Sequence, residues 1–346
     1  MKIFSQVRPD VKNSGIDQED KTNRTQPKNT PTVDIDVPTF TGYEEESKKV
    51  VTKAKLIAPK PLGGFNLRPF ARVVKSADEP ANKNYVLLDF NSDDWVFTQS
   101  TIVASVNLEE NGFSITPDSA EHINCNGNGW DSALLAKWYK TFIGAHNYKD
   151  HVQEKYQSKG IILDAVLRKI DIDDAIGYVY YVDILVATNK NKDRVWADAV
   201  AKGKIKWMSM GAVSSSLTCS RCGNVSFGEE DDCEHQIFEV GMNYIDDKGI
   251  KRKIASLITD EINPEGNGFM VFQEASYLSV DPAYKGAVQG HIINVEPNTS
   301  VKFQVPRKAL VREAFQYWGI EERQIKGVTP MEVINDEDVK PSLYEV

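Results

Sequence analysis

The sequence has few of the residues that secreted scaffolds, membrane spans and nucleic-acid-binding surfaces require. Only 4 of its 346 residues are cysteines, too few for a disulfide framework. No apolar run approaches the roughly 20 residues that cross a bilayer, and the N-terminal stretch lacks the apolar core typical of a signal peptide. Acidic residues outnumber basic ones by 50 to 41, so the net charge of −9 disfavours a direct role in holding nucleic acid. We expect an intracellular protein with no membrane partner.

Composition divides the chain into four parts. Residues 1–60 are polar and rich in Asp, Asn, Lys, Thr and Pro, which predicts a flexible arm. Residues 61–212 and 237–300 contain short β-like runs between turn residues and predict one catalytic domain, with a small insertion at 213–236. Residues 301–346 predict a helix followed by an acidic tail. The expected fold is α+β, a strand-dominated β-barrel domain with covering helices.

Local patterns place the expected elements within these parts. Alternating or continuous apolar runs predict strands over 85–90, 95–105, 160–167, 177–187, 205–211 and 268–280, and two more around a turn at 246–249 within 238–258. Helical spacing of apolar residues after Asp or Pro predicts helices over 131–144, 193–202 and 306–318.

A cluster of cysteines lies in the insertion. Cys219 and Cys222 form a Cys-x-x-Cys pair, and Cys233 and His235 follow after ten intervening residues. Two soft pairs at this spacing suit a tetrahedral zinc ion, and four protein ligands leave no position for an activated water. The polar loop between the pairs has little apolar content with which to fold by itself. We therefore predict a structural zinc site rather than a catalytic one.

One serine lies in an unusually apolar setting. Ser209 is flanked by Met208 and Met210 and followed by Gly211, which suggests a buried strand that a substrate backbone can approach. A serine nucleophile needs a histidine base within hydrogen-bond reach and a group that orients the base. With His235 assigned to the cysteines and His122 and His291 lying elsewhere, His146 and His151 remain. By themselves these residues are more typical of a structural serine and of two solvent-exposed loop histidines.

Four segments taken together resemble a known family. They are Phe142–His151, Lys159–Val166, Met208–Gly211 and Gln273–Ala283, and the likeness spans roughly Trp95 to Ala287. Their order is similar to that of the prohead maturation serine proteases of tailed phages, relatives of herpesvirus assemblin. A Ser-Met-Gly motif followed closely by a Cys-x-x-Cys-Gly knuckle resembles a subset of these proteases. The resemblance implies an assemblin-like barrel with a zinc-knuckle insertion.

The resemblance also implies roles for particular residues. Ser209 takes the position of the nucleophile, and His151 fits the position of the base better than His146 does. Glu274 takes the position of the third member, with Asp281 and Asp183 as alternatives. Backbone N–H groups near Met210 and Gly211 are candidate donors for an oxyanion hole.

The same resemblance implies substrates, location and partners. A prohead protease cleaves the phage scaffold protein, the N-terminal segment of the major capsid protein and in some cases itself, inside the assembling prohead in the host cytoplasm. A homo-oligomer is compatible with such a role. The alternative is a non-enzymatic structural or scaffolding head protein that has the same fold and zinc site.

Overall fold

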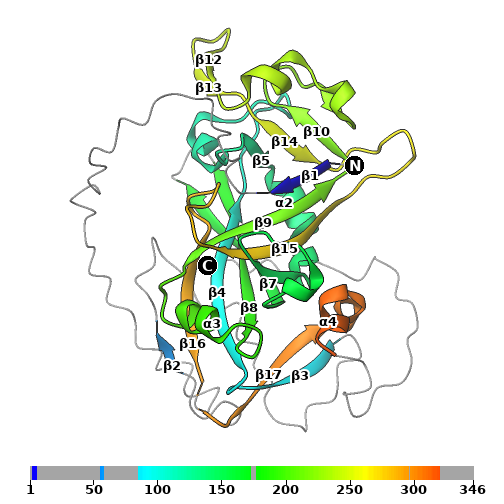
Figure 1. Ribbon diagram of the computed structural model, residues 1–346. Coiled ribbons are helices and arrows are strands. Elements are labelled where there is room, and N and C mark those ends of the chain that lie inside the picture. Colours follow the sequence, from blue (N-terminus) through cyan, green and yellow to red (C-terminus); the bar gives the residue numbers. More distant parts are fainter. Residues whose placement is uncertain (1, 6–54, 58–84, 173–176, 296, 320–346) are drawn as a thin grey trace, which may run out of the picture.

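Seven strands close into a barrel at the centre of the molecule (Figure 1). The computed structural model describes residues 2–5, 55–57, 85–172, 177–295 and 297–319. Around the barrel the order of strands is β9 (Trp207–Ser214), β15 (Met270–Leu278), β6 (His146–Lys149), β7 (Gly160–Ile172), β8 (Gly177–Asn189), β4 (Trp95–Ala104) and β16 (Val288–Asn294), which returns to β9. The expected strand-dominated α+β fold is confirmed.

The longest pairings form where the sequence has long β-branched and aromatic runs. β7 and β8 make an antiparallel hairpin, and β4 pairs with β8 along nine residues, from Trp95 opposite Asn189 to Ala104 opposite Tyr181. All but the first residue of β4 are buried, because this strand is covered on both faces. Such burial explains why its sequence is continuously apolar or weakly polar rather than alternating. The strands expected over 95–105, 160–167 and 177–187 are thus confirmed.

The interior of the barrel can be located from one hydrogen bond. The hydroxyl of Tyr277 on β15 meets Oγ1 of Thr98 on β4, and these strands lie on opposite sides of the ring. Tyr277 therefore points into the barrel, and so do its register partner Met208 and, two residues further on, Met210. Residues between them on β9 and β15, such as Ser209, point to the outer face of the barrel wall.

Helices cover the barrel and begin where their caps predict. Asp131 accepts hydrogen bonds from the backbone of Ala133 and Leu134 at the start of α2 (Ser132–Trp138). Asp193 caps α3 (Arg194–Ala201) in the same way. The expected helix over 131–144 ends earlier, at Trp138, because the chain tightens there into the 3₁₀ turn η3 (Tyr139–Phe142).

The prediction of a helix over 306–318 is largely wrong. Over 306–318 the structure has the end of β17 (Ser300–Pro306), the 3₁₀ turn η7 (Arg307–Val311) and the short helix α4 (Glu313–Tyr317). β17 pairs with β3 (Tyr85–Asn91), which confirms the strand expected over 85–90. Most of the expected arm at 1–60 and the acidic tail beyond residue 319 lie outside the described residues.

A second sheet carries the cysteines and forms the upper part of the molecule in Figure 1. Its order is β11 (Val225–Ser226), β10 (Ser216–Cys219), β14 (Ser256–Thr259) and β5 (Asn128–Trp130), and we call residues 216–259 the metal lobe. The two strands expected within 238–258 are confirmed as the hairpin β12 (Asn243–Ile245) and β13 (Lys251–Lys253). Phe238, however, belongs to a π-helical turn, η6 (His235–Glu239).

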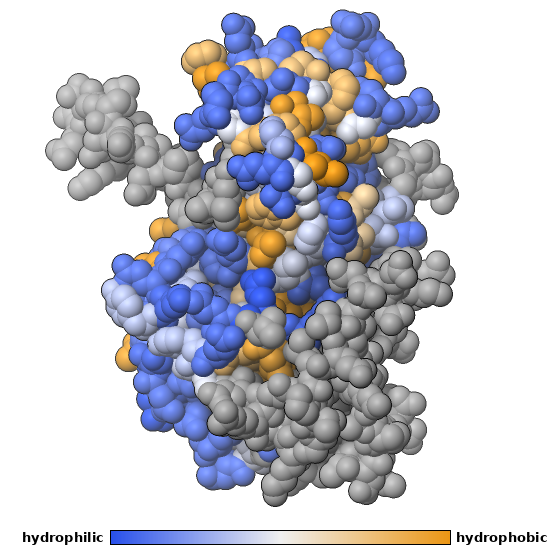
Figure 2. Space-filling model, turned by 90° about the vertical axis from the view of Figure 1, so that its right-hand side faces the viewer, coloured by the Kyte–Doolittle hydropathy of each residue, from blue (hydrophilic) through white to orange (hydrophobic). Residues whose placement is uncertain are grey.

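The outer surface of the metal lobe is partly apolar. Ile237, Phe238, Met242 and Ile245 are exposed large hydrophobic side chains. In Figure 2, hydrophobic side chains interrupt the charged surface over the upper part of the molecule. Among the described residues, no helix is both long and apolar enough to cross a membrane.

Candidate functional site

The two strands that carry the candidate nucleophile and acid lie side by side. β9 and β15 are antiparallel, with Ser209 opposite Ser276 and Gly211 opposite Glu274. Residues that are directly opposite in an antiparallel pair project to the same face of the sheet. Ser209, Glu274 and Ser276 therefore share the outer face of the barrel wall, and all three are almost fully buried.

The candidate base reaches this face from a turn. After β6 the chain turns at Asp150 and His151, whose φ angles of 51° and 57° are left-handed. The carboxylate of Asp150 accepts hydrogen bonds from the backbone N–H and the hydroxyl of Ser279, at 2.6 and 2.7 Å. These bonds tie the turn to the end of β15. The backbone strain that left-handed residues carry is thus held by fixed contacts, as is common at functional positions.

His151 and Glu274 form a buried pair. Nδ1 of His151 lies 2.6 Å from Oε1 of Glu274, and their side chains are 8% and 1% exposed. The other carboxylate oxygen, Oε2, accepts a hydrogen bond of 2.6 Å from the hydroxyl of Ser276. With Oε1 accepting from Nδ1–H, the proton of a neutral imidazole is on Nδ1 and Nε2 is left basic. This is the tautomer that a general base requires.

Two polar atoms at the site have no partner. Oγ of Ser209 and Nε2 of His151 are both buried, and neither makes a hydrogen bond to any other described residue. Buried polar atoms are nearly always paired, so each orphan needs a reason. Catalytic hydrogen bonds are frequently long before substrate binds and shorten in the complex. Two such orphans, a serine hydroxyl and a histidine nitrogen on one face of the barrel wall, fit that description.

Gly211 makes room for this arrangement. A Cβ atom on Gly211 would lie 2.9 Å from Oε1 of Glu274 and 2.9 Å from Nε2 of Gln153. Gln153 itself donates to the same carboxylate oxygen at 3.4 Å. Any larger residue at 211 would therefore push on the acid that holds His151. The absence of a side chain serves the packing of the site as well as access to it.

The candidate oxyanion donors lie on the same strand. Met210 and Gly211 are consecutive residues of β9, and successive N–H groups of a strand point to opposite edges. Only one of the two can therefore face the edge of β9 that is not paired with β15. The choice between them remains a prediction.

The other candidates from the sequence lie apart from this constellation. Nδ1 of His146 is bonded to the hydroxyl of Ser158 at 2.8 Å rather than to a carboxylate. Burial, helped by the charges of Lys155 and Arg312, lowers the pKa of His146 to about 4. His146 is buried and the side chain of His151 is only 8% exposed, so the interpretation of both as solvent-exposed loop residues is wrong.

The two alternative acids are also elsewhere. Asp183 is fully buried and binds Arg168 through Nε at 2.7 Å, and it accepts from Thr101 at 2.6 Å. Asp281 lies exposed in the loop that follows β15. Of the three carboxylates, Glu274 is the one that is hydrogen-bonded to a histidine within the described part of the chain.

Three further residues of the site were not expected from the sequence. Ser276 and Gln153 bind the Glu274 carboxylate, and Tyr148 is buried near it. Burial raises the pKa of Tyr148 to about 12, and the negative charge of Glu274 adds to this effect. A period-two reading of Glu274-x-Ser276 would have placed Ser276 beside the acid, whereas nothing local indicates Gln153.

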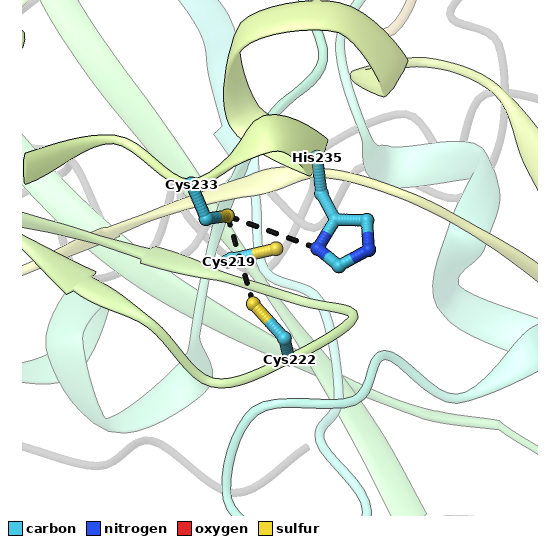
Figure 3. Close-up of side chains that lie close together, drawn as sticks. All are labelled: Cys219, Cys222, Cys233 and His235. Atoms are coloured by element: carbon cyan, nitrogen blue, oxygen red, sulfur yellow. Dashed lines mark hydrogen bonds between the residues drawn. The ribbon is translucent and has the colours of Figure 1, made fainter.

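The four cysteine-cluster residues point toward one another (Figure 3). Their ligand atoms all lie within 4.8 Å of each other, with 3.6 Å between the sulfurs of Cys222 and Cys233 and 3.8 Å from Cys233 Sγ to His235 Nδ1. These separations match a four-ligand shell with metal–ligand bonds of about 2.0–2.3 Å. The Cys₃His cluster can therefore bind a metal ion.

The local fold explains how the cluster forms. Cys219 ends β10, and the chain turns back through Gly223, whose φ of +73° is left-handed and whose N–H donates to the carbonyl of Cys219. Burial raises the pKa of the Cys219 thiol to about 12. Burial also tends to raise the pKa of the Cys222 thiol. Hydrogen bonds from the backbone N–H of Asn224 and from the side chains of the cluster outweigh this effect and lower the pKa to about 7. A bound cation would stabilise both groups as thiolates.

Comparison of the chain with protein-family models, curated proteins and solved structures found no match.

Proposed function

We propose that this protein is a serine endopeptidase with Ser209 as nucleophile, His151 as general base and Glu274 as the acid that orients the base. The observation that carries the proposal is the buried His151–Glu274 pair, whose free Nε2 lies on the barrel face that also bears the unpaired Oγ of Ser209. Burying a carboxylate and leaving a buried hydroxyl without a hydrogen bond both cost free energy, and a catalytic role would account for that cost.

The proposed reaction follows from this geometry. Oγ of Ser209 attacks the scissile carbonyl carbon while its proton passes to Nε2 of His151, and Glu274 stabilises the resulting imidazolium. The developing oxyanion accepts a hydrogen bond from a β9 backbone N–H, from Met210 or Gly211. His151 then gives the proton to the leaving amine. Water, activated by the same histidine, hydrolyses the acyl-serine and regenerates the hydroxyl.

We further propose that the enzyme matures a tailed-phage prohead by cleaving scaffold and capsid-protein segments. Support comes from the resemblance of the segments around His151, Gly160, Ser209 and Glu274 to those of prohead proteases, and from the arrangement of Ser209, His151 and Glu274 that the family's roles require. The cluster of Cys219, Cys222, Cys233 and His235 would hold zinc as a structural ion, since four protein ligands complete its shell.

The test combines reactivity with cleavage. Purified wild-type protein, Ser209→Ala and the same-strand control Ser214→Ala are treated with a fluorophosphonate probe, and separately incubated with the cognate scaffold protein before intact-mass measurement. We expect the probe on Ser209, and scaffold fragments with wild type and Ser214→Ala only. Folded, metal-loaded wild type that neither labels nor cleaves would favour the non-enzymatic head protein instead.

A further inference from the structure

One edge of the nucleophile strand is only partly closed. β9 pairs with β15 along its whole length on one side, but on the other side it meets β16 only where Trp207 is opposite Val288. We call this contact between β9 and β16 the seam. Two backbone hydrogen bonds flank it: the N–H of Met208 donates to the carbonyl of Ala287, and the N–H of Gln289 donates to the carbonyl of Lys206. Beyond it β16 and β9 separate. Among the described residues, no strand pairs with this edge at Ser209.

A segment from the N-terminal part of the chain occupies the rest of the edge. β1 (Lys2–Ser5) pairs antiparallel with β9, from Lys2 opposite Ser214 to Ser5 opposite Gly211. Figure 1 shows this short strand lying along β9 at the margin of the barrel. β1 runs toward Ser209 and ends two residues short of it in register.

We propose that the edge of β9 from Ser209 to Ser214 is the docking site for substrate polypeptide, and that β1 occupies this site as an internal competitor. The ligand class is an extended, unfolded peptide segment that adds to the sheet as an antiparallel strand. The direction of β1 assigns polarity to that peptide: residues on the N-terminal side of the scissile bond lie along 211–214, and the chain then passes Ser209. The assignment of cleavage rests on the proposed function, whereas the docking does not.

Three features of the edge support this assignment. Within the described residues no barrel strand pairs with β9 beyond this seam, and the N–H and C=O groups of such an edge form a template for another extended chain. The edge is continuous with the seam, so a peptide that follows β9 is guided past the nucleophile rather than away from it. The resident pairing covers only four residues, which is short enough for a longer peptide to displace.

Docking can be measured without catalysis. Amide hydrogen exchange is followed in Ser209→Ala and in the same protein carrying Ile3→Pro and Phe4→Pro, since proline removes the N–H groups that a ladder needs. The matched control is Leu56→Pro, which disrupts β2 (Lys55–Ile57), another short strand, where it pairs with β16. The probe ligand is a synthetic peptide with the sequence of residues 1–8, compared with a scrambled version.

We expect faster exchange over residues 211–214 in the Ile3/Phe4 variant only, and renewed protection when the peptide is added. In the active background, the rate of fluorophosphonate labelling at Ser209 should rise by about tenfold, which corresponds to the loss of one or two net hydrogen bonds. If the exchange rates of residues 211–214 change neither in the proline variant nor on addition of the peptide, the proposed docking site is wrong.

The two proposals fail in distinguishable ways. If exchange responds as expected but Ser209 is not labelled in any variant, the edge binds peptide and the protease assignment is wrong. If Ser209 is labelled but exchange over 211–214 does not change, the protease stands and the docking edge is wrong.

Discussion

Nδ1 of His151 lies 2.6 Å from Oε1 of Glu274, although 123 residues separate the two in the sequence. The contact exists because β6 runs parallel to β15, with His146 opposite Glu274, and the chain then turns back over the barrel wall at Asp150. The carboxylate fixes both the orientation and the tautomer of the ring.

Replacing Glu274 by Gln should therefore abolish most of the reactivity of Ser209 while leaving the shape of the site intact. We expect labelling and cleavage to fall by about 10³–10⁴-fold, because the amide favours the wrong imidazole tautomer. Ser276→Ala, which removes only a bond to the other carboxylate oxygen, should cost about tenfold. Equal rates of labelling and cleavage in Glu274→Gln and wild type would contradict the assignment of Glu274 as the acid. A comparable loss of labelling in folded Asp183→Asn would assign that role to Asp183 instead.

Gly211→Ala tests whether the space beside the acid matters. Its Cβ would come within 2.9 Å of both Glu274 and Gln153, so the carboxylate must move. We expect labelling of Ser209 to fall by about 10²-fold through displacement of His151, with a stability loss of about 1–3 kcal/mol. Gly129→Ala is the matched control, since its Cβ would meet the side chains of Leu257 and Val106 at 3.3–3.4 Å, a tight contact that lies away from Glu274. Full activity in Gly211→Ala would show that the acid's position is not critical.

Removal of the metal should destabilise the metal lobe. Elemental analysis is expected to find one zinc per chain, which a strong chelator or Cys222→Ser removes, with a fall in the thermal midpoint on the order of 10 °C. Cys125→Ser serves as the control, because Cys125 is an exposed thiol outside the cluster. Retention of zinc by Cys222→Ser, or a chelator-insensitive midpoint, would argue against a structural metal at this site.

Stability should decrease on mild acidification because of His146. Its pKa is about 4 in the folded protein against an ordinary value of 6.5, so between these values the unfolded chain binds the extra proton. The free energy of unfolding should therefore fall by about 3 kcal/mol as pH decreases from 6.5 to 4. Urea titrations of wild type and His146→Gln across this range isolate the effect, since contributions from other buried histidines cancel in the difference. Parallel pH curves for the two proteins would refute it.

The parts of the fold that the sequence predicts are those with local signals. The caps at Asp131 and Asp193, the hairpin of β7 and β8 and the cysteine cluster all depend on residues close together in the chain. Closure of the barrel depends instead on which strands, distant in sequence, pair with each other. No local pattern predicts that β16 pairs with β9 at a single residue.

The same distinction applies to the site. Ser209 and Glu274 were expected through resemblance, but their common face follows from the register between β9 and β15, two strands that are far apart in the sequence. The burial of His151 could not be predicted, because polar sequence around it is typical of an exposed loop. Its position depends on the turn at Asp150 being bound to Ser279, a long-range contact.

Only Ser215 separates β9 from β10. Its backbone N–H donates a hydrogen bond to the carbonyl of Phe269, and its hydroxyl donates one to the carbonyl of Glu261. The strand that carries Ser209 thus continues almost directly into the strand that ends in Cys219 of the metal cluster. We expect a bound metal ion to restrict the movement of the end of β9 that lies next to β10. On the proposed function, loss of the metal would then weaken the docking of peptide along β9 more than it changes the reactivity of Ser209.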